Sequence, residues 1–370
     1  METDYIVSSE FWESAACDVM VNDRDTVAVE QAQIIESWCL DKDELHGCLL
    51  FSTSGSTGGR KWVVLSRQAV LESAKAVNQR FHVTAKDHWL LALPLFHVGG
   101  MGVAARAYLA SCQLSVSVDR WDAEVFHSLL GKKGVTLTSL VPAQLSDLVN
   151  AELRAPDGLR GAFIGGGSLL EDVYQKAIEL GWPVLETYGM TEAASQIATA
   201  SSAGRRLKVL PCWDTRVDTN GILMIYGKPL FKGYLRVTGS HVEMETTSVD
   251  GWFHTNDLVE IDGGHLSFKG RADRCVKVLG ELVDLVRVEE QLRSYLDERE
   301  VAVFAMSDDR KESRLLAVVE GAADLELLNV ALDAYNKVCI PVARVDSISC
   351  VEKLPRSALG KILYAELGLL

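Results

Sequence analysis

The sequence lacks the cysteine spacing of a zinc site or of a disulfide framework. Its eight cysteines are scattered along 370 residues, without a CxxC pair or a histidine cluster beside them. This distribution indicates reduced thiols with mostly structural roles, as in the cytoplasm. Also absent are an apolar run near the roughly 20 residues that span a bilayer and, in METDYIVSSEFWE, the basic region and apolar core of a signal peptide. We therefore expect a soluble, cytoplasmic protein without a membrane partner.

Positive charge is also scarce. The chain has 37 lysines and arginines against 51 aspartates and glutamates, which gives a formal net charge of −14. This balance argues against a general nucleic-acid or anionic-membrane binder, although an acidic protein can bind ATP where the local site is basic. The apolar fraction of 48% is that of a globular protein with a substantial core, and a length of 370 residues favours two domains.

Short apolar runs alternate with helical patterns between residue 47 and about residue 200. The expected strands are GCLLFS, HWLLALPLF, LSVSVD, VTLTSLV, GAFIGGG and PVLETYG. The expected helices between them are SRQAVLESAKAVNQRF, AEVFHSLLGKKG and SLLEDVYQKAIELG. Strands that alternate with helices predict mostly parallel sheets that are covered by helices on both faces.

The pattern changes over residues 204–270, where turn signals such as Asn220-Gly221 and Asp250-Gly251 separate short strands. This predicts an antiparallel β subdomain. Helices and strands mix again after this region, which predicts a small α+β domain. We therefore expect an α/β fold in which a large N-terminal domain over residues 1–270 is followed by a small C-terminal domain over residues 271–370.

A glycine-rich polar loop, FSTSGSTGGRKWVV from Phe51 to Val64, lies between two apolar runs. A Walker A loop requires a hydroxyl residue directly after its lysine, whereas Lys61 is followed by Trp62. Glycines let backbone N–H groups converge on an anion, and hydroxyl and lysine side chains add donors. On these residues alone, a phosphate-binding loop and a solvated turn between two strands are comparable interpretations.

Further motifs follow that loop in a fixed order. The six segments are TSGSTGGRK (53–61), LPLFHVGG (93–100), YGMTE (188–192), GWFHTND (251–257), GRAD (270–273) and LPRSALGK (354–361). In this order they resemble the adenylate-forming superfamily of acyl-CoA synthetases, luciferases and peptide-synthetase adenylation domains. The resemblance implies an adenylation domain followed by a mobile lid domain. It also implies that a carboxylate attacks the α-phosphate of ATP, with Mg²⁺ as cofactor, CoA as co-substrate and pyrophosphate as product.

The resemblance implies roles for individual residues. The ATP phosphates are bound by the loop residues Thr53, Ser54, Gly55, Ser56, Thr57, Gly58 and Lys61. The AMP-binding residues are Gly165, Gly166, Gly167, Tyr188, Gly189, Asp257 and Arg271. The catalytic residues are Lys361, Thr191, Glu192 and His97. The hinge is Asp273, and Gly280 lines the pantetheine tunnel once the small domain has rotated.

These implied roles have physical reasons. Tyr188 stacks on adenine, Asp257 accepts from the ribose hydroxyls, and Glu192 holds Mg²⁺, a cation that prefers oxygen ligands. Lys361 contacts the carboxylate and the α-phosphate, because a positioned cation stabilises the negative charge that grows on the phosphoryl oxygens. Arg60 stands where proline is common in the family and keeps the loop basic.

The acyl substrate is indicated by two short segments. YGMTE continues as AASQIATA, and Arg106 follows His97 by nine residues. These features resemble the o-succinylbenzoate–CoA ligase branch, which serves menaquinone biosynthesis. One carboxylate of that acid is activated, and the other needs a partner because burying it alone is costly. We expect this partner to come from Arg106, Ser195 and Gln196, and we expect His97 to guard the acyl pocket. The alternative is that Arg106 is a surface or interdomain arginine.

Three other functions remain open. The chain could act on another acyl or aryl acid, it could load a carrier protein as a stand-alone adenylation domain, or it could be a nucleotide-binding regulatory module without catalysis. The expected partners are ATP, o-succinylbenzoate and CoA, and nucleic acid is not among them. Only about fifty residues precede Thr53, fewer than in many family members, so a second subunit could cover this flank in a homo-oligomer.

Overall fold

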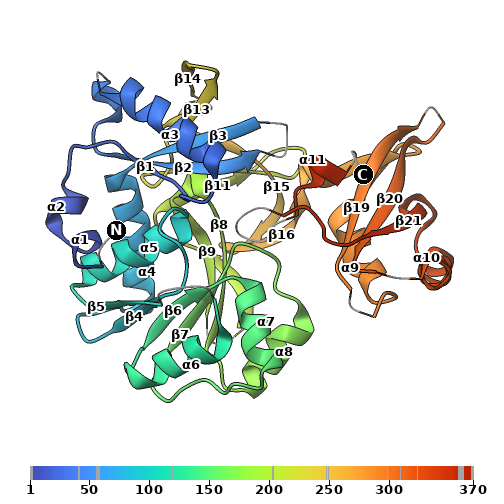
Figure 1. Cartoon of the computed structure of the whole chain (residues 1–370), viewed down its shortest axis with the longest axis horizontal. Coiled ribbons are helices and arrows are strands. Elements are labelled where there is room, and N and C mark those ends of the chain that lie inside the picture. Colours follow the sequence, from blue (N-terminus) through green and yellow to red (C-terminus); the bar gives the residue numbers. More distant parts are fainter. Residues whose placement is uncertain are drawn as a thin grey trace.

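The protein has a large N-terminal part that contains two sheets and a smaller C-terminal part (Figure 1). This mixed α/β architecture confirms the expected fold class. The computed structural model describes residues 3–40, 42–55, 59–117, 121–201, 204–246, 248, 250–297, 299–308, 310–322, 324–356 and 362–367. Within these residues, none of the helices combines the length and apolar character needed to cross a membrane.

The first sheet has five strands in the order β1-β2-β3-β13-β14. Their bounds are β1 (Asp18–Met20), β2 (Cys48–Gly55), β3 (Gly59–Ser66), β13 (Gly233–Thr238) and β14 (His241–Glu245). β1 and β2 are parallel, and the other pairs are antiparallel. The ends of β2 and β3 carry the phosphate loop motif, so this sheet positions that loop.

The second sheet has eleven strands in the order β11-β12-β15-β16-β10-β9-β8-β7-β6-β4-β5. Its first five strands along the chain are parallel: β4 (His88–Leu91), β5 (Gln113–Val116), β6 (Leu137–Leu140), β7 (Gly161–Ile164) and β8 (Val184–Met190). The antiparallel strands are β9 (Ser195–Ser201), β10 (Gly204–Val209), β11 (Trp213–Val217), β12 (Ile222–Gly227), β15 (Phe253–Asp262) and β16 (His265–Arg271). The strands expected over residues 204–270 therefore extend the parallel sheet, except that β13 and β14 join the first sheet.

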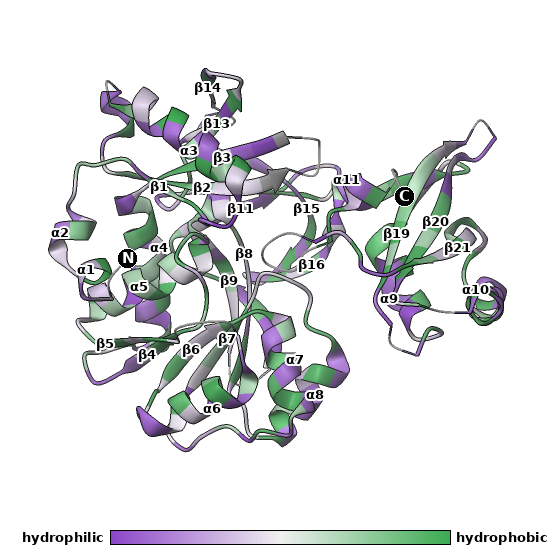
Figure 2. Ribbon diagram, in the orientation of Figure 1, coloured by the Kyte–Doolittle hydropathy of each residue, from purple (hydrophilic) through white to green (hydrophobic). Residues whose placement is uncertain are grey.

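The helices of the large part lie against these sheets. They are α1 (Thr3–Ile6), α2 (Ser9–Trp12), α3 (Thr26–Cys39), α4 (Arg67–Phe81), α5 (Val98–Ala110), α6 (Ala123–Lys132), α7 (Pro142–Asn150) and α8 (Glu171–Glu179), with the 3₁₀ turns η1 (Asp43–Leu45) and η2 (Thr191–Ala193). Asp25, Ser66 and Asp122 cap the N-termini of α3, α4 and α6 through their side-chain oxygens. Figure 2 shows hydrophilic and hydrophobic residues mixed along α7 and α8, as expected for helices with one solvated face.

Helix α5 differs from its sequence pattern. The segment HWLLALPLF suggested a long strand, but β4 ends at Leu91 and α5 begins at Val98. Glycine disfavours helix formation, and α5 contains three glycines near its start. Burial overrides that propensity, because every residue from 100 to 107 is buried. A Cβ at Gly100 would lie 2.3 Å from the Pro94 carbonyl oxygen, so this close approach requires glycine.

The smaller C-terminal part has its own apolar core. It contains the hairpin β17 (Cys275–Val278) and β18 (Glu281–Asp284), and the sheet β19 (Val301–Asp308), β20 (Glu312–Glu320) and β21 (Val345–Val351). Its helices are α9 (Leu285–Arg293), α10 (Leu325–Val338) and α11 (Tyr364–Leu367), with the 3₁₀ turns η3 (Ala272–Arg274) and η4 (Pro341–Ala343). The separate core makes this part a structural unit beside the large one.

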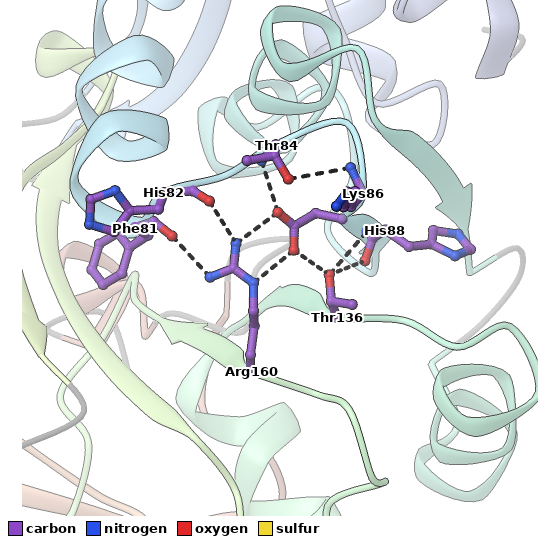
Figure 3. Close-up of polar contacts among 8 residues, drawn as sticks. Phe81, His82, Thr84, Lys86, His88, Thr136 and Arg160 are labelled. Carbon is purple, nitrogen blue, oxygen red and sulfur yellow. Dashed lines mark hydrogen bonds and ion pairs between the residues drawn. The ribbon is translucent and has the colours of Figure 1, made fainter.

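A polar network ties the starts of three parallel strands to the end of α4 (Figure 3). The Arg160 guanidinium donates to Asp87 Oδ1 at 2.7 Å and to Oδ2 at 2.8 Å, and also to the Phe81 carbonyl at 2.9 Å. Burial alone would raise the pKa of the Asp87 carboxyl, but hydrogen bonds from Arg160, the Thr84 amide and Thr136 lower it to about 2. Asp87 therefore stays ionised and holds these segments in register.

Arg160→Gln should lower the free energy of unfolding by about 1–3 kcal/mol at neutral pH, because Asp87 loses a charged donor in a mostly buried site. The native pKa of Asp87 lies below its ordinary value of 3.8, so the stabilisation is present above pH 4 and is lost as the pH falls towards 2. Urea unfolding at several pH values checks this. The exposed pair Arg236–Glu245 provides the control, since Arg236→Gln should cost about 0–1 kcal/mol. Equal losses in the two variants would contradict the prediction.

Candidate active site

The centre of the site is the end of β8, where the YGMTE motif begins. The Tyr188 hydroxyl donates to Asp257 Oδ2 on β15 at 2.6 Å, and the Asp257 side chain is almost fully buried. Burial, followed by the nearby Asp257 carboxylate, raises the pKa of Tyr188 above its ordinary value. Tyr188 therefore remains a hydrogen-bond donor at neutral pH. The sequence assigned both residues to one nucleotide site, and the fold brings them together from segments 69 residues apart.

Arg271 links this pair to the start of the smaller part. Its Nη1 donates to Asp257 Oδ1 at 3.0 Å, while its Nε and Nη2 each donate to the Asp273 carboxylate at 2.8 Å. The hydrogen bonds to Asp273, and then the charges of both carboxylates, raise the pKa of Arg271 against the effect of burial. Asp273 lies in η3, directly after the last strand of the large sheet. The expected ribose-binding residues and the expected hinge residue thus form one continuous network.

Glu192 has a partner that the sequence analysis did not identify. The Tyr234 hydroxyl donates to Glu192 Oε1 at 2.7 Å, and the Phe231 amide donates to the Glu192 carbonyl at 2.9 Å. The Lys61 ammonium lies 4.8 Å from the centre of the Tyr234 ring. Tyr234 therefore joins the strand of the phosphate loop motif to the turn that carries Glu192. Tyr234 lies in the segment FKGYLR, where an aromatic residue follows a glycine in a strand. Nothing in that segment indicated a contact with YGMTE.

Part of the phosphate loop motif is described. Thr53 on β2 lies opposite Lys61 on β3, and Thr53 Oγ1 donates to the Lys61 carbonyl at 3.4 Å. Ser54 and Gly55 are described only through their strand pairing with Arg60 and Gly59. Three expected phosphate ligands lie outside the described residues, namely Ser56, Thr57 and Gly58.

Arg60 does not add free positive charge to this loop. Its Nη2 forms an ion pair with Asp25 Oδ2 at 2.6 Å, and its Nη1 donates to Ser52 Oγ at 3.3 Å. Asp25 is also the N-cap of α3. The expectation that Arg60 keeps the loop basic was therefore wrong, because a carboxylate from α3 offsets its charge.

The glycines near the site permit close backbone approaches. A Cβ at Gly165, directly after β7, would lie 2.2 Å from Thr187 Oγ1, and a Cβ at Gly189 would lie 1.6 Å from the Ser195 carbonyl oxygen. Because glycine has no Cβ at either position, β7, β8 and β9 can approach one another closely near Tyr188. Gly166 and Gly167 continue the turn after β7, and Gly166 has a left-handed φ of 85°.

Arg106 lies on α5 and is 1% exposed. Its guanidinium carbon is 5.6 Å from the ring centres of both Trp89 and Phe163. Burial lowers the pKa of Arg106 to about 10, so the side chain still carries its charge at neutral pH. Its Nε has no hydrogen-bond partner, and Arg106 forms no ion pair with any described carboxylate. A buried cation of this kind is costly unless an anion joins it. It is a core residue, so the surface interpretation was wrong.

The structure places Ser195 beside Arg106 but gives Gln196 a different partner. A Cβ at Gly102 would lie 3.4 Å from Arg106 Nη2 and 3.6 Å from Ser195 Oγ, so these two polar groups flank one point on α5. Gln196 is buried, and its Oε1 accepts from Thr199 Oγ1 at 2.8 Å within β9. Arg106 and Ser195 can therefore meet the same anionic group, whereas Gln196 supports the strand.

The remaining expected residues lie around this centre. His97 is the residue directly before α5, and its ring is 4.6 Å from that of Phe96. Thr191 begins η2 beside Glu192. Gly280 forms the turn between β17 and β18, with a φ of 81°, and its amide donates to Glu312 Oε2 at 2.6 Å.

Lys361 lies outside the described residues. Arg356 and Ile362, which precede and follow it, form an isolated β-bridge, and Arg356 Nη2 donates to Glu320 Oε2 at 3.0 Å. On the C-terminal side the Tyr364 hydroxyl donates to Glu289 Oε2 at 2.9 Å. Both flanks of the LPRSALGK motif are thus attached to the small part.

This fold, with Tyr188, Glu192 and Asp257 gathered at one end of a large sheet, defines an adenylate-forming protein. The sequence profile of the AMP-binding enzyme family matches residues 13–242, and the chain belongs to that family.

Named relatives match most of the chain. A 2-succinylbenzoate–CoA ligase of Bacillus cereus is 31% identical over 358 residues, which cover 91% of this chain and 72% of the relative. The enzyme of the same name from Bacillus cytotoxicus is 31% identical over 337 residues, covering 85% of this chain and 68% of the relative.

Solved structures give the same picture. The o-succinylbenzoate CoA synthetase of Bacillus subtilis, in complex with its acyl-adenylate intermediate, has a TM-score of 0.75 and 25% identity, covering 86% of this chain and 68% of that one. The same enzyme with ATP and a magnesium ion also has a TM-score of 0.75 and 25% identity, with 86% and 69% covered.

Two buried arginines should respond oppositely to removal of their charge. Arg106→Met should leave the unfolding free energy unchanged or raise it by up to about 2 kcal/mol, because an unpaired buried charge is replaced by an apolar side chain. Arg67 is equally buried but forms an ion pair with Asp18, so Arg67→Met should cost about 3–5 kcal/mol. Urea unfolding without ligands compares the two. If the Arg106 variant lost as much as the Arg67 variant, Arg106 would be a structural cation and this interpretation would be wrong.

Proposed function

We propose that the chain is an o-succinylbenzoate–CoA ligase. It converts o-succinylbenzoate, ATP and CoA into o-succinylbenzoyl-CoA, AMP and pyrophosphate, a reaction of menaquinone biosynthesis. The observation that carries this assignment is the buried Arg106 beside Ser195, a cation that forms no ion pair with a carboxylate of the described residues. A substrate that keeps a second carboxylate after activation would supply the missing anion. The relatives named for this activity support the same conclusion.

The nucleotide binds where Tyr188, Asp257 and Arg271 meet. We propose that Tyr188 stacks on the adenine and that Asp257 and Arg271 contact the ribose. Asp257 already accepts from Tyr188 and Arg271, so its position is fixed before the ligand arrives. The glycines Gly165, Gly166, Gly167 and Gly189 let the strands approach the base closely. Thr191 hydrogen-bonds the α-phosphate.

The phosphates of ATP lie towards the first sheet. Thr53, Ser54, Gly55, Ser56, Thr57, Gly58 and Lys61 hold the β- and γ-phosphates in this proposal. Glu192 suits Mg²⁺, because its Oε2 accepts no hydrogen bond from the described residues while Tyr234 fixes Oε1. Carboxylate oxygens are the ligands that this cation takes beside nucleotide phosphates. When bound, Mg²⁺ offsets phosphate charge during adenylation.

The reaction has two steps. The succinyl carboxylate of the substrate attacks the α-phosphorus, the bond to the β-phosphate oxygen breaks, and pyrophosphate leaves. Lys361 stabilises the charge that develops on the α-phosphoryl oxygens. The small part then turns about Asp273, which withdraws Lys361 and brings Gly280 to the pantetheine tunnel. The CoA thiolate attacks the mixed anhydride and AMP leaves, while His97 shields the acyl pocket.

The wider assignments belong to the same proposal. The adenylation domain covers residues 1–270, its β-rich segment covers about 204–270, and the lid domain covers 271–370. The separate cores of the two parts support this division. We propose that the enzyme works in the cytoplasm on small molecules, and that it does so without nucleic acid. A homo-oligomer remains a hypothesis that sedimentation would test.

A panel of acids tests the proposed function. Pyrophosphate release is measured with ATP and Mg²⁺, with and without CoA, for o-succinylbenzoate, benzoate, 4-coumarate, acetate and a medium-chain fatty acid. Only o-succinylbenzoate should react well, and a CoA thioester should be found by mass spectrometry. A different preferred acid would refute the acid assignment. Adenylation without thioester formation would favour a carrier-protein partner, and no reaction with any acid would favour a regulatory module.

Arg106→Met should reduce kcat/KM for o-succinylbenzoate by roughly 100-fold, because the ring carboxylate loses a buried charged partner. The matched substrate is 4-oxo-4-phenylbutanoate, which has the same skeleton without the ring carboxylate. Its kcat/KM should be low for both enzymes and should change little on substitution. If the variant lost activity equally on both acids, Arg106 would not be the carboxylate partner.

Tyr234→Phe should weaken ATP binding in the presence of Mg²⁺ by roughly tenfold, because Glu192 loses a hydrogen bond to a charged group. ATP binding with EDTA should be unchanged, since the tyrosine acts through the carboxylate that holds the cation. Calorimetric titration of the two conditions measures the difference without turnover. Tyr226 is 46% exposed, so Tyr226→Phe serves as the control. Equal weakening with and without Mg²⁺ would show that Tyr234 acts on the nucleotide by another route.

A further inference from the structure

A second candidate site lies on the large sheet, away from the residues discussed so far. It is a cavity of about 400 Å³ between the end of α4 and the strands β9, β10 and β16. Its lining residues are Arg80, Ser201, Gly204, Arg206, Lys208 and His265. We call it the basic cavity.

The basic cavity gathers positive charge in an acidic protein. Three of its six lining residues are arginine or lysine and a fourth is histidine, whereas none is a carboxylate. Lys208 and His265 lie directly opposite each other on β10 and β16. Asp262 is the strand partner of His265 but does not line the cavity. Arg206 and Lys208 both line the cavity and no lining residue is a carboxylate, so this arrangement favours an anion beside them.

The neighbouring residue on β10 shows the contrast. Arg205 donates to Glu186 at 2.8 Å and to Glu171 at 2.5 Å, so two carboxylates offset its charge. Arg206 and Lys208 form no ion pair with any described carboxylate. Because successive side chains of a strand point to opposite faces, the paired and the unpaired cations lie on opposite sides of β10.

Arg80 provides a donor that is fixed in place. Its Nη2 donates to the Thr199 carbonyl at 3.0 Å, and its guanidinium carbon lies 5.5 Å from the centre of the Phe81 ring. Its Nε is buried without a hydrogen-bond partner, and burial lowers the pKa of Arg80 below its ordinary value. Arginine forms strong charge-assisted hydrogen bonds to phosphate, and its two Nη atoms carry further N–H donors beside the one that the Thr199 carbonyl accepts.

The basic cavity is distinct from the nucleotide site but shares two of its elements. Strand β9 begins at Ser195 beside Arg106 and reaches the cavity at Ser201, a span of roughly 20 Å at about 3.3 Å per residue. The hairpin of β15 and β16 carries Asp257 and Arg271 at one end and His265 near the other. A ligand in the cavity would therefore lie about one strand length from the acyl pocket.

We propose that the basic cavity binds the phosphate group of a small molecule. Its volume admits a phosphate with part of the molecule that carries it, and its donors come from a fixed arginine and two exposed cationic side chains. The phosphate can come from a free anion such as pyrophosphate or from the nucleotide end of CoA. The chemistry recognised is the same in both cases, and the experiment separates the two sources.

The test compares the double variant Arg206→Gln/Lys208→Gln with the charge-matched control Lys75→Gln/Lys86→Gln, whose two lysines are exposed and lie outside the cavity. Calorimetric titrations use inorganic pyrophosphate, CoA and 3′-dephospho-CoA, with the nucleotide site filled by a non-hydrolysable ATP analogue. The cavity variant should bind pyrophosphate or CoA at least roughly tenfold more weakly than wild type. The control should change by less than about twofold, since distant surface charges are screened by salt.

Each outcome decides the proposal. Weaker binding of CoA with unchanged binding of 3′-dephospho-CoA would assign the cavity to the 3′-phosphate of CoA. Weaker binding of pyrophosphate alone would assign it to a free anion. Unchanged binding of all three probes in a folded cavity variant would overturn the proposal. The titrations involve no turnover, so they remain informative even if the acid panel rejects the proposed ligase activity.

Discussion

The proposed nucleotide site depends on one buried carboxylate, Asp257. A carboxylate removed from water must be hydrogen-bonded or it destabilises the fold, and the partners of Asp257 come from separate parts of the chain. Tyr188 reaches it from the end of β8, and Arg271 reaches it from the end of β16. Because Arg271 also holds Asp273, the same carboxylate connects the large sheet to the start of the smaller part. The proposed rotation about Asp273 must therefore either carry Arg271 with it or replace one of the two carboxylate partners of Arg271. Ribose hydroxyls are suited to that replacement, since they can both donate and accept.

The distribution of cations carries much of the functional information. In a chain with a net charge of −14, carboxylates are plentiful, and six of the twelve described arginines up to Arg271 have an acidic partner. Arg60, Arg67, Arg160 and Arg205 are examples. Arg106 and the cations of the basic cavity differ, because they form no such pair with described residues. Leaving the buried Arg106 without a carboxylate costs stability, and a ligand anion is the physical reason that fits this place. The exposed cations of the basic cavity are solvated, and their common position around one cavity is what favours an anion there.

The sequence allowed some of this arrangement to be predicted and not the rest. Alternating apolar and helical segments indicated the parallel sheet, and the ordered motifs indicated which residues share the nucleotide site. Most strands after residue 204 join that same sheet, and the sequence did not predict this. Pairing at a sheet edge depends on tertiary contacts, which local sequence patterns do not encode. The role of Tyr234 was missed for the same reason, since its contact with Glu192 joins residues 42 positions apart. Helix α5 was missed because its glycines disfavour a helix and only burial stabilises it.

The proposed role of Arg106 as carboxylate partner links acid specificity to the core. The residue lies on α5 beside Trp89 of β4 and Phe163 of β7, which stack on each other with ring centres 5.5 Å apart. Aromatic faces attract the guanidinium and fix its orientation, while no carboxylate in the described part of the chain offsets its charge. The cation is thus held ready for an anion by packing and not by an ion pair. Replacing Arg106 by a much smaller residue such as alanine, in order to change the accepted acid, would also require repacking around Trp89 and Phe163, because that replacement leaves a cavity beside the two rings.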